Sequence, residues 1–149
     1  MNNKALWSVA VGSLIFSGCG LGPPVSALAA PPPSAGVCKQ KQCMVTVRVA
    51  ACSITLDPDW LGVAKGNRDV EIIWEIRGSP GVVFAKGDAI FLKDPAVVGK
   101  HFREPKAPGD TKYRWLHANS GPGIYYYGVR VVDNGKACPP YDPVIIDEM

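Results

Sequence analysis

The sequence lacks the cysteine and histidine spacings that are typical of metal sites. It has only two histidines, His101 and His117, among 149 residues. The four cysteines that follow Cys19 are separated by gaps of four, eight and eighty-five residues. Zinc motifs instead use cysteine pairs two residues apart or additional histidines. These spacings disfavour a zinc site.

A long uninterrupted apolar run is also absent. The first residues, MNNKALWSVAVGSLIFSGCGLG, carry one charge, Lys4, followed by an apolar stretch that serines and glycines interrupt and Pro23 ends. A membrane-spanning helix needs about 20 mostly apolar residues, so we expect no transmembrane span. One charge followed by a short apolar stretch is instead the layout of a secretory signal peptide.

Two processing routes remain open for this leader. Ala27-Leu28-Ala29 is a small-x-small cleavage site, which would make residues 1–29 a signal peptide and 30–37 a Pro/Ala-rich linker. Alternatively, Phe16-Ser17-Gly18-Cys19 resembles a bacterial lipoprotein box, in which Cys19 would carry a lipid anchor. Phe16 fits that box poorly, so release is preferred. Either route predicts export: periplasmic or secreted, or alternatively lipid-anchored to the bacterial membrane.

The charge pattern lacks a strong bias. Sixteen Lys/Arg, one of them in the leader, stand against thirteen Asp/Glu, and no basic run alternates with aromatic residues. We therefore expect no nucleic-acid partner. The remaining chain, residues 38–149, has the length of one domain.

Helical periodicity is also missing, and alternation with period two replaces it. MVTVRVA, residues 44–50, and DVEIIWEIR, residues 69–77, each place apolar residues on one face. Shorter β-rich segments follow, separated by turn signals such as KGN, GSPG and DNGK. The best helical candidate, PAVVGKHF at 95–102, is at most two turns long. About eight short strands predict an all-β, antiparallel Greek-key β-sandwich.

The late segment Gly123-Ile124-Tyr125-Tyr126-Tyr127-Gly128 resembles the strand that precedes the copper-binding cysteine in cupredoxins. Together with KGNRDVEIIWEIRG, VVFAKGDAIFLKD and YDPVIID, it is similar to cupredoxin-like domains without copper that occur in small exported bacterial proteins. The resemblance implies a cupredoxin-like sandwich and no settled activity. Val129 stands where the copper thiolate would be, and no histidine follows His117, so no type 1 copper and no other cofactor is expected.

Catalytic motifs are absent from the sequence. Ser120 lies in HANSGPG, a turn rather than a nucleophile motif. We therefore expect a non-enzymatic binding or structural module, whose partner would be an unknown protein or small ligand in the periplasm. The alternative is a periplasmic metal-handling protein that uses His101 and His117 in a non-blue site.

The aromatic residues divide into two groups. Trp74, Tyr125 and Tyr127 alternate onto strand faces with other large apolar residues and are expected in the core. Tyr126 and Arg130 alternate onto the opposite face, and Trp60 is expected in the DPDW turn. Trp60, Tyr126 and Arg130 are therefore the candidate residues of a binding surface.

Four cysteines in an exported protein predict two disulfides, and three pairings are open. The preferred pairing joins Cys52 to Cys138 and Cys38 to Cys43, because an early strand and the last strand of a Greek-key sandwich are often neighbours.

Overall fold

The protein is described here by a computed structural model that covers residues 34–147. The predicted signal peptide, Cys19 and the first half of the predicted linker lie outside these residues. The described part contains strands and one short 3₁₀ helix, η1, at Pro95–Val97. Its strands are β1 Ala35–Cys38, β2 Gln42–Ala50, β3 Ser53–Asp57, β4 Trp60–Val63, β5 Val70–Ile76, β6 Val82–Phe84, β7 Ile90–Leu92, β8 Phe102–Gly109, β9 Lys112–His117, β10 Ile124–Val129, β11 Val131–Asp133, β12 Lys136–Ala137 and β13 Val144–Asp147.

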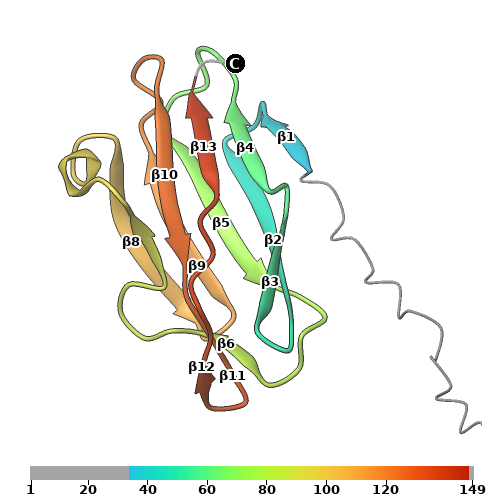
Figure 1. The fold of residues 1–149 in the computed structure, drawn as a ribbon. Helices are drawn as coiled ribbons and strands as arrows, with labels where there is room; N and C mark the ends of the chain where they lie inside the picture. The colour runs from blue at the N-terminus through green and yellow to red at the C-terminus, as the bar shows by residue number, and fades with distance from the viewer. Residues whose placement is uncertain (1–33, 148–149) are drawn as a thin grey trace, which may run out of the picture. The chain divides into compact units, whose positions relative to one another are not determined.

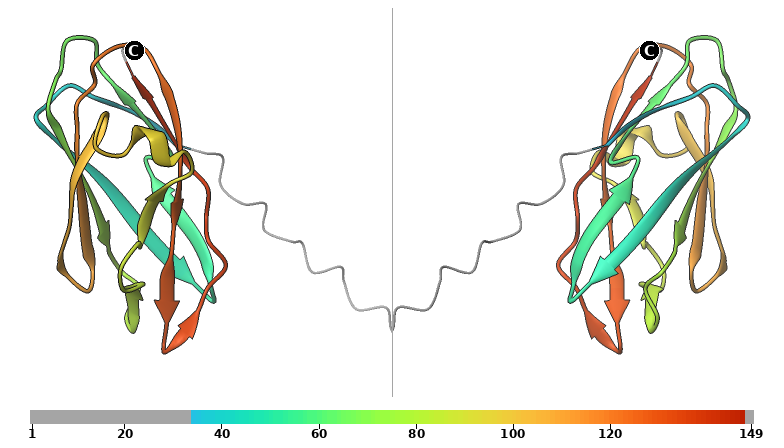
Figure 2. Two further views of the ribbon diagram at one scale, coloured as in Figure 1. Left: turned by 90° about the vertical axis from the view of Figure 1, so that its left-hand side faces the viewer. Right: turned by 90° about the vertical axis from the view of Figure 1, so that its right-hand side faces the viewer.

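Two five-stranded sheets form the body of the fold. Sheet I has the order β1-β4-β13-β10-β7, and sheet II has the order β3-β2-β5-β9-β8. Figure 1 shows β4, β13 and β10 in front of β2, β5 and β9, and Figure 2 views the two layers from their edges. A small third sheet, β12-β11-β6, lies at one end. The predicted all-β class is confirmed.

The sheets are mixed, so the prediction of a purely antiparallel sandwich is wrong in this respect. Strand β2 runs parallel to β5, and β4 runs parallel to both of its neighbours, β1 and β13. The other pairs within sheets I and II are antiparallel. Alternation with period two shows which side chains share a face, but it carries no information on strand direction.

The core fills the space between the two sheets. Trp74 of β5 and Tyr127 of β10 are each about 1 % exposed, and their rings meet edge to face with centroids 5.4 Å apart. The Trp74 indole N–H donates to the Tyr127 hydroxyl oxygen over 3.1 Å, which joins sheet II to sheet I through a buried hydrogen bond. Tyr125 is also buried. The predicted core placement of these three aromatic residues is therefore confirmed.

Several elements differ from the sequence prediction. Strand β1 begins at Ala35, inside the segment predicted as a linker, and Trp60 is the first residue of β4 rather than part of a turn. The predicted helical segment contains only η1, whose first turn Asp94 caps by accepting a hydrogen bond from the amide of Ala96. No helix within residues 34–147 is long and apolar enough to cross a membrane.

The disulfides follow the preferred pairing. Cys38 is joined to Cys43, with Cα atoms 5.7 Å apart, and Cys52 is joined to Cys138, with Cα atoms 5.1 Å apart. The structural reason differs from the one expected, because the last strand, β13, lies between β4 and β10 rather than beside β2. Cys52 lies in the turn between β2 and β3, and Cys138 follows β12. The long bridge therefore ties together two hairpins.

Candidate functional site

The outward side of sheet I presents two cross-strand rows of mostly apolar residues. In one row, Tyr126 of β10 is opposite Val144 of β13, which is opposite Trp60 of β4. In the next row, the residues from β10 to β1 are Ile124, Ile146, Gly62 and Val37. Residues directly opposite each other point to the same side of a sheet. We call these positions, with Phe91 of β7, the outer face: Val37, Trp60, Phe91, Ile124, Tyr126, Val144 and Ile146.

Three of the seven side chains on the outer face are strongly exposed, and the other four are partly exposed. Tyr126 is 62 % exposed, Ile124 60 % and Val37 47 %, while Trp60, Val144 and Ile146 are half-buried. A sheet that faces water on one side normally alternates apolar residues inward with polar residues outward. In sheet I the outward positions are apolar, and an exposed apolar patch of this kind is typical of a binding surface.

Sheet II serves as an internal comparison. On its outward side Glu71 pairs with Arg114, and Glu75 accepts from Lys112 over 3.0 Å. The neighbouring arginine and lysine lower the pKa of Glu75, with hydrogen bonds from Arg77 first and Lys112 second. Apolar residues such as Met44, Ile73 and Leu116 also occupy outward positions of sheet II, beside these ion pairs. The two outward faces of one sandwich therefore differ: the outer face of sheet I is apolar and aromatic, and that of sheet II mixes ion pairs with apolar residues.

Cations border the outer face at β7. Phe91 is opposite Gly128, and its ring covers that glycine so closely that a Cβ there would lie 2.1 Å from the ring. The Arg130 guanidinium lies 4.0 Å from the centroid of the Phe91 ring and also pairs with Asp88. Lys93 approaches the same ring at 6.0 Å and pairs with Asp142 over 2.8 Å.

The structure thus brings together the three predicted surface residues. Trp60 and Tyr126 occupy one cross-strand row, and Arg130 stacks on Phe91 on the same side of sheet I. Four further residues of this surface, Phe91, Val144, Ile146 and Val37, carry no signal in the sequence that marks them as part of it. Trp60 joins it through the parallel β4–β13 pair, which no local pattern indicates.

A groove of about 390 Å³ adjoins the outer face at the start of β10. Its lining comes from β7, the residues leading into η1, and β10: Leu92, Lys93, Asp94, Val97, Gly123, Ile124, Tyr125 and Tyr126. Tyr126 and Ile124 belong to both the groove and the outer face, so the apolar surface continues into a depression.

His117 lies in the interior, where both ring nitrogens have protein partners. Its Nδ1 lies 3.1 Å from the carbonyl oxygen of His101, and its Nε2 lies 2.6 Å from Oδ1 of Asp147. The side chains of His117 and Asp147 are both fully buried. Because a carbonyl only accepts, Nδ1 donates in the first contact, and Nε2 is hydrogen-bonded to the Asp147 carboxyl group in the second. Coordination of a metal by His117 would require one of these hydrogen bonds to break.

His101 belongs to a second, more exposed group of polar side chains. Its Nδ1 lies 3.2 Å from the hydroxyl of Ser120 and 3.2 Å from the hydroxyl of Tyr125. Burial raises the pKa of Tyr125 to about 12, and the nearby Asp147 carboxylate adds to that shift. The sequence analysis did not place Ser120 beside a histidine. Within residues 34–147, the carboxylate that could orient an imidazole contacts His117 instead of His101.

One further cluster has metal-ligating residue types. Cys52, Asp133 and Cys138 lie within 4.8 Å of one another, and they are the one such group found in the described part of the chain. Both sulfur atoms belong to the disulfide, so neither is a thiolate ligand. Val129, at the position that the resemblance assigns to a copper thiolate, is fully buried, and its backbone pairs with Ile90 and Tyr141.

A comparison with the models of known protein families finds no match to this chain, and a comparison with curated proteins finds no significant match either. The functional argument therefore depends on the residues described above.

Proposed function

We propose that this protein is an exported, non-enzymatic binding module with a cupredoxin-like sandwich, and that its outer face binds a partner protein. The observation that carries the proposal is the contrast between the outer face of sheet I, which is apolar and aromatic throughout, and the outward side of sheet II, where ion pairs lie among the apolar residues. Exposed aliphatic residues such as Ile124 and Val37 favour the apolar surface of another protein over a sugar or a small polar ligand.

The composition of the outer face supports this assignment. Protein interfaces are enriched in aromatic residues and arginine at their centre and have a polar rim. Here Trp60 and Tyr126 provide the aromatic centre, and the ion pairs Arg130–Asp88 and Lys93–Asp142 provide a rim. Both side chains of each rim pair are at least two-fifths exposed, so they would orient a partner more than they would strengthen its binding.

The cupredoxin-like part of the proposal has separate support. The described strands form two layers around an aromatic core, and the segment that resembles the copper-site strand is β10, in the interior of sheet I. With buried Val129 in place of a thiolate, the module would keep the sandwich and use its surface instead of a metal.

A photocrosslinking experiment followed by reconstitution tests the function. A photoreactive phenylalanine analogue at position 126 should give a defined adduct in the bacterium that makes the protein, and mass spectrometry should identify the partner. With the purified partner, Tyr126→Asp and Ile124→Asp should each weaken binding by about tenfold or more in calorimetry, because each places a charge in an apolar contact.

Thr55→Asp provides the matched control. Thr55 is exposed on β3, and this strand belongs to sheet II, on the other side of the sandwich. Its substitution should change the affinity by less than about twofold, as expected for a residue outside the interface. Equal losses for Thr55→Asp and Tyr126→Asp, or full affinity in the Tyr126→Asp variant, would contradict the proposal.

A further inference from the structure

Strand β1 forms an open edge of sheet I. The amides of Trp60 and Ala64 donate to the carbonyl oxygens of Ser34 and Cys38, over 3.2 and 2.9 Å. Because backbone groups of successive residues point to opposite sides of a strand, the N–H and C=O groups of Ala35 and Val37 point away from β4. Within residues 34–147, no hydrogen bond to these four groups is found.

Within the described part of the chain, the first residues of β2 also have unpaired backbone groups, on the side of the strand that faces away from β5. The amide of Glu71 donates to the carbonyl of Lys41 over 2.8 Å, so the odd-numbered residues of β2 face β5. The backbone groups of Gln42 and Met44 therefore point the other way, where β3 pairs only from Thr46 onward. Two strand edges, one from each sheet, are open at the same corner of the sandwich.

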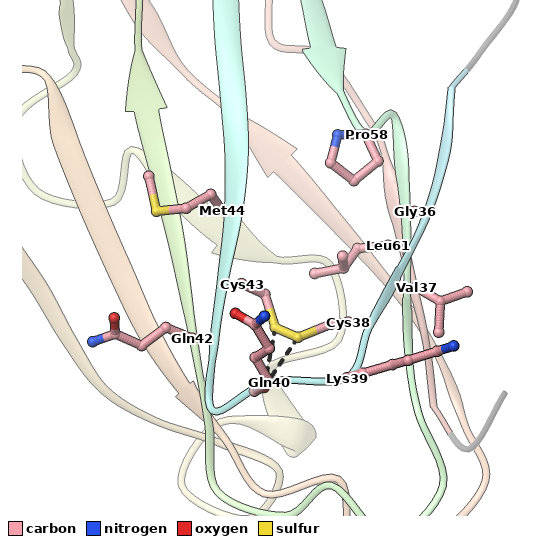
Figure 3. Close-up of a pocket in the computed structure, with 10 residues that line it drawn as sticks. All are labelled: Gly36, Val37, Cys38, Lys39, Gln40, Gln42, Cys43, Met44, Pro58 and Leu61. Carbon is pink, nitrogen blue, oxygen red and sulfur yellow. Dashed lines mark hydrogen bonds between the residues drawn. A yellow bond between two sulfur atoms is a disulfide. The ribbon is translucent and has the colours of Figure 1, made fainter.

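A groove of about 380 Å³ lies at this corner (Figure 3). Its lining is Gly36, Val37, Cys38, Lys39, Gln40, Gln42, Cys43, Met44, Pro58 and Leu61. Apolar side chains dominate, and Met44 and Val37 are 42 % and 47 % exposed. Pro58 packs against Gly36, where a Cβ would lie 2.7 Å from the proline Cγ. The groove therefore offers an apolar wall directly beside the open backbone of β1.

The groove is closed at one end, and that end is positively charged. The turn between β1 and β2 and the Cys38–Cys43 disulfide hold the two strands together there. Lys39 belongs to the lining, and no aspartate or glutamate lines the groove. The Nζ of the neighbouring Lys41 instead donates to the carbonyl oxygen of Arg68. An extended chain lying in the groove would reach the turn and the disulfide, where a terminal carboxylate would meet Lys39.

A different edge strand, at the far side of sheet II, is protected against pairing. Strand β8, at the edge of sheet II, contains Pro105, Lys106 and Pro108 and has register shifts against β9. Prolines, lysines and bulges at an edge prevent pairing with another chain. Strand β1 has no proline or charged residue among its four residues, Ala35–Cys38.

We propose that β1 binds the C-terminal segment of a partner protein as an added strand of sheet I. Alternate side chains of this segment enter the groove against Leu61 and Pro58, the others extend the outer face beside Val37, and the terminal carboxylate lies beside Lys39. The inference depends on the proposed function, because it specifies which part of a partner protein the module recognises. Main-chain hydrogen bonds to Ala35 and Val37 supply affinity, and the groove supplies specificity.

A displayed library of random octapeptides with free C-termini tests this inference on the purified exported chain. Selected peptides should have apolar residues at alternate positions, and a synthetic copy should bind in calorimetry. N-methylation of the peptide amides that face β1 should weaken binding by about tenfold or more, because each removes a backbone hydrogen bond in an apolar setting. N-methylation at the intervening residues should leave binding within about threefold, since those amides face solvent.

A double-mutant cycle tests the contact between the peptide carboxylate and Lys39. Amidation of the peptide C-terminus and the Lys39→Gln substitution should weaken binding by similar factors, and the two changes together should cost no more than either alone. A Lys136→Gln variant, which removes an exposed cation on β12, should bind like the unaltered protein. No selected peptide, insensitivity to N-methylation, or additive effects of the two changes would overturn the proposal.

Failure of this inference is distinguishable from failure of the proposed function. Tyr126 and β1 are separated by β13 and β4, so Tyr126→Asp should leave peptide binding within about twofold. One outcome is partner binding that is sensitive to Tyr126→Asp but insensitive to Lys39→Gln and to loss of the partner's C-terminus. In that case the outer face remains the binding surface, and strand addition is ruled out. Peptide binding without any adduct from position 126 would support strand addition and rule out the outer face as the binding surface.

Discussion

Removal of the Cys52–Cys138 bridge should destabilise the protein more than removal of the Cys38–Cys43 bridge. The two bridges connect residues 86 and 5 positions apart. In the chain-entropy model, loops of these lengths restrict the unfolded chain by about 4.6 and about 2 kcal/mol. Cys38 and Cys43 are 7 % and 5 % exposed, whereas Cys52 is half-buried. Lost side-chain packing alone would therefore make removal of the Cys38–Cys43 bridge the more destabilising change. The predicted ranking therefore depends on loop length.

The assay compares two double variants, Cys52→Ala/Cys138→Ala and Cys38→Ala/Cys43→Ala, without reductant. Guanidinium unfolding followed by tryptophan fluorescence should give free energies that differ by about 2–3 kcal/mol. The melting temperatures should differ by about 10 °C or more. The long-loop variant should also have the larger m-value, because its unfolded chain expands further. Equal losses, or a greater loss from the short loop, would refute the reasoning.

Two further changes follow from single contacts. Gly128→Ala should destabilise the protein by about 1–3 kcal/mol in the same unfolding assay, because the new Cβ requires the Phe91 ring to move; Gly109→Ala, which has open space around its Cβ, should cost less than about 1 kcal/mol, and equal costs would contradict the packing argument. Burial raises the pKa of Tyr125 and Tyr141 to about 12, with Asp59 contributing at Tyr141. Since the unfolded chain ionises near pH 10 and these phenols ionise later, stability should fall as the pH rises from about 10 to 12. Phenolate absorbance should rise later in the folded protein than in guanidinium, and coincident titrations would contradict this expectation.

Local alternation predicted most of the strands because side chains on the two faces of a strand meet different surroundings. The segments around Val45, Trp74 and Tyr127 each form a strand with the expected buried face. The sequence places Trp60 in a turn because Asp57-Pro58-Asp59 precedes it, whereas in the structure the four-residue strand β4 begins at Trp60. Strand β8 shows no alternation, because all of its residues after Phe102 are exposed.

The candidate site could be predicted only in part. Tyr126 and Arg130 could be placed on one face by continuing the alternation of β10 one residue beyond its end at Val129. Their association with Trp60 and Val37 depends on which strands are neighbours, and long-range pairing has no local signal. The contact between His117 and Asp147 is of the same kind, since it joins residues 30 positions apart through the sandwich interior.

The position of β13 determines when sheet I can form during synthesis. Residues 144–147 fill the space between β4 and β10, and Val144 is opposite Trp60. Until these residues have left the ribosome, β4 and β10 each present an open edge, and Ile145, fully buried in the finished core, is missing. Pairing across such sequence distances makes folding slow. Sheet II contains only strands that precede residue 118, so sheet I should close after sheet II has already formed.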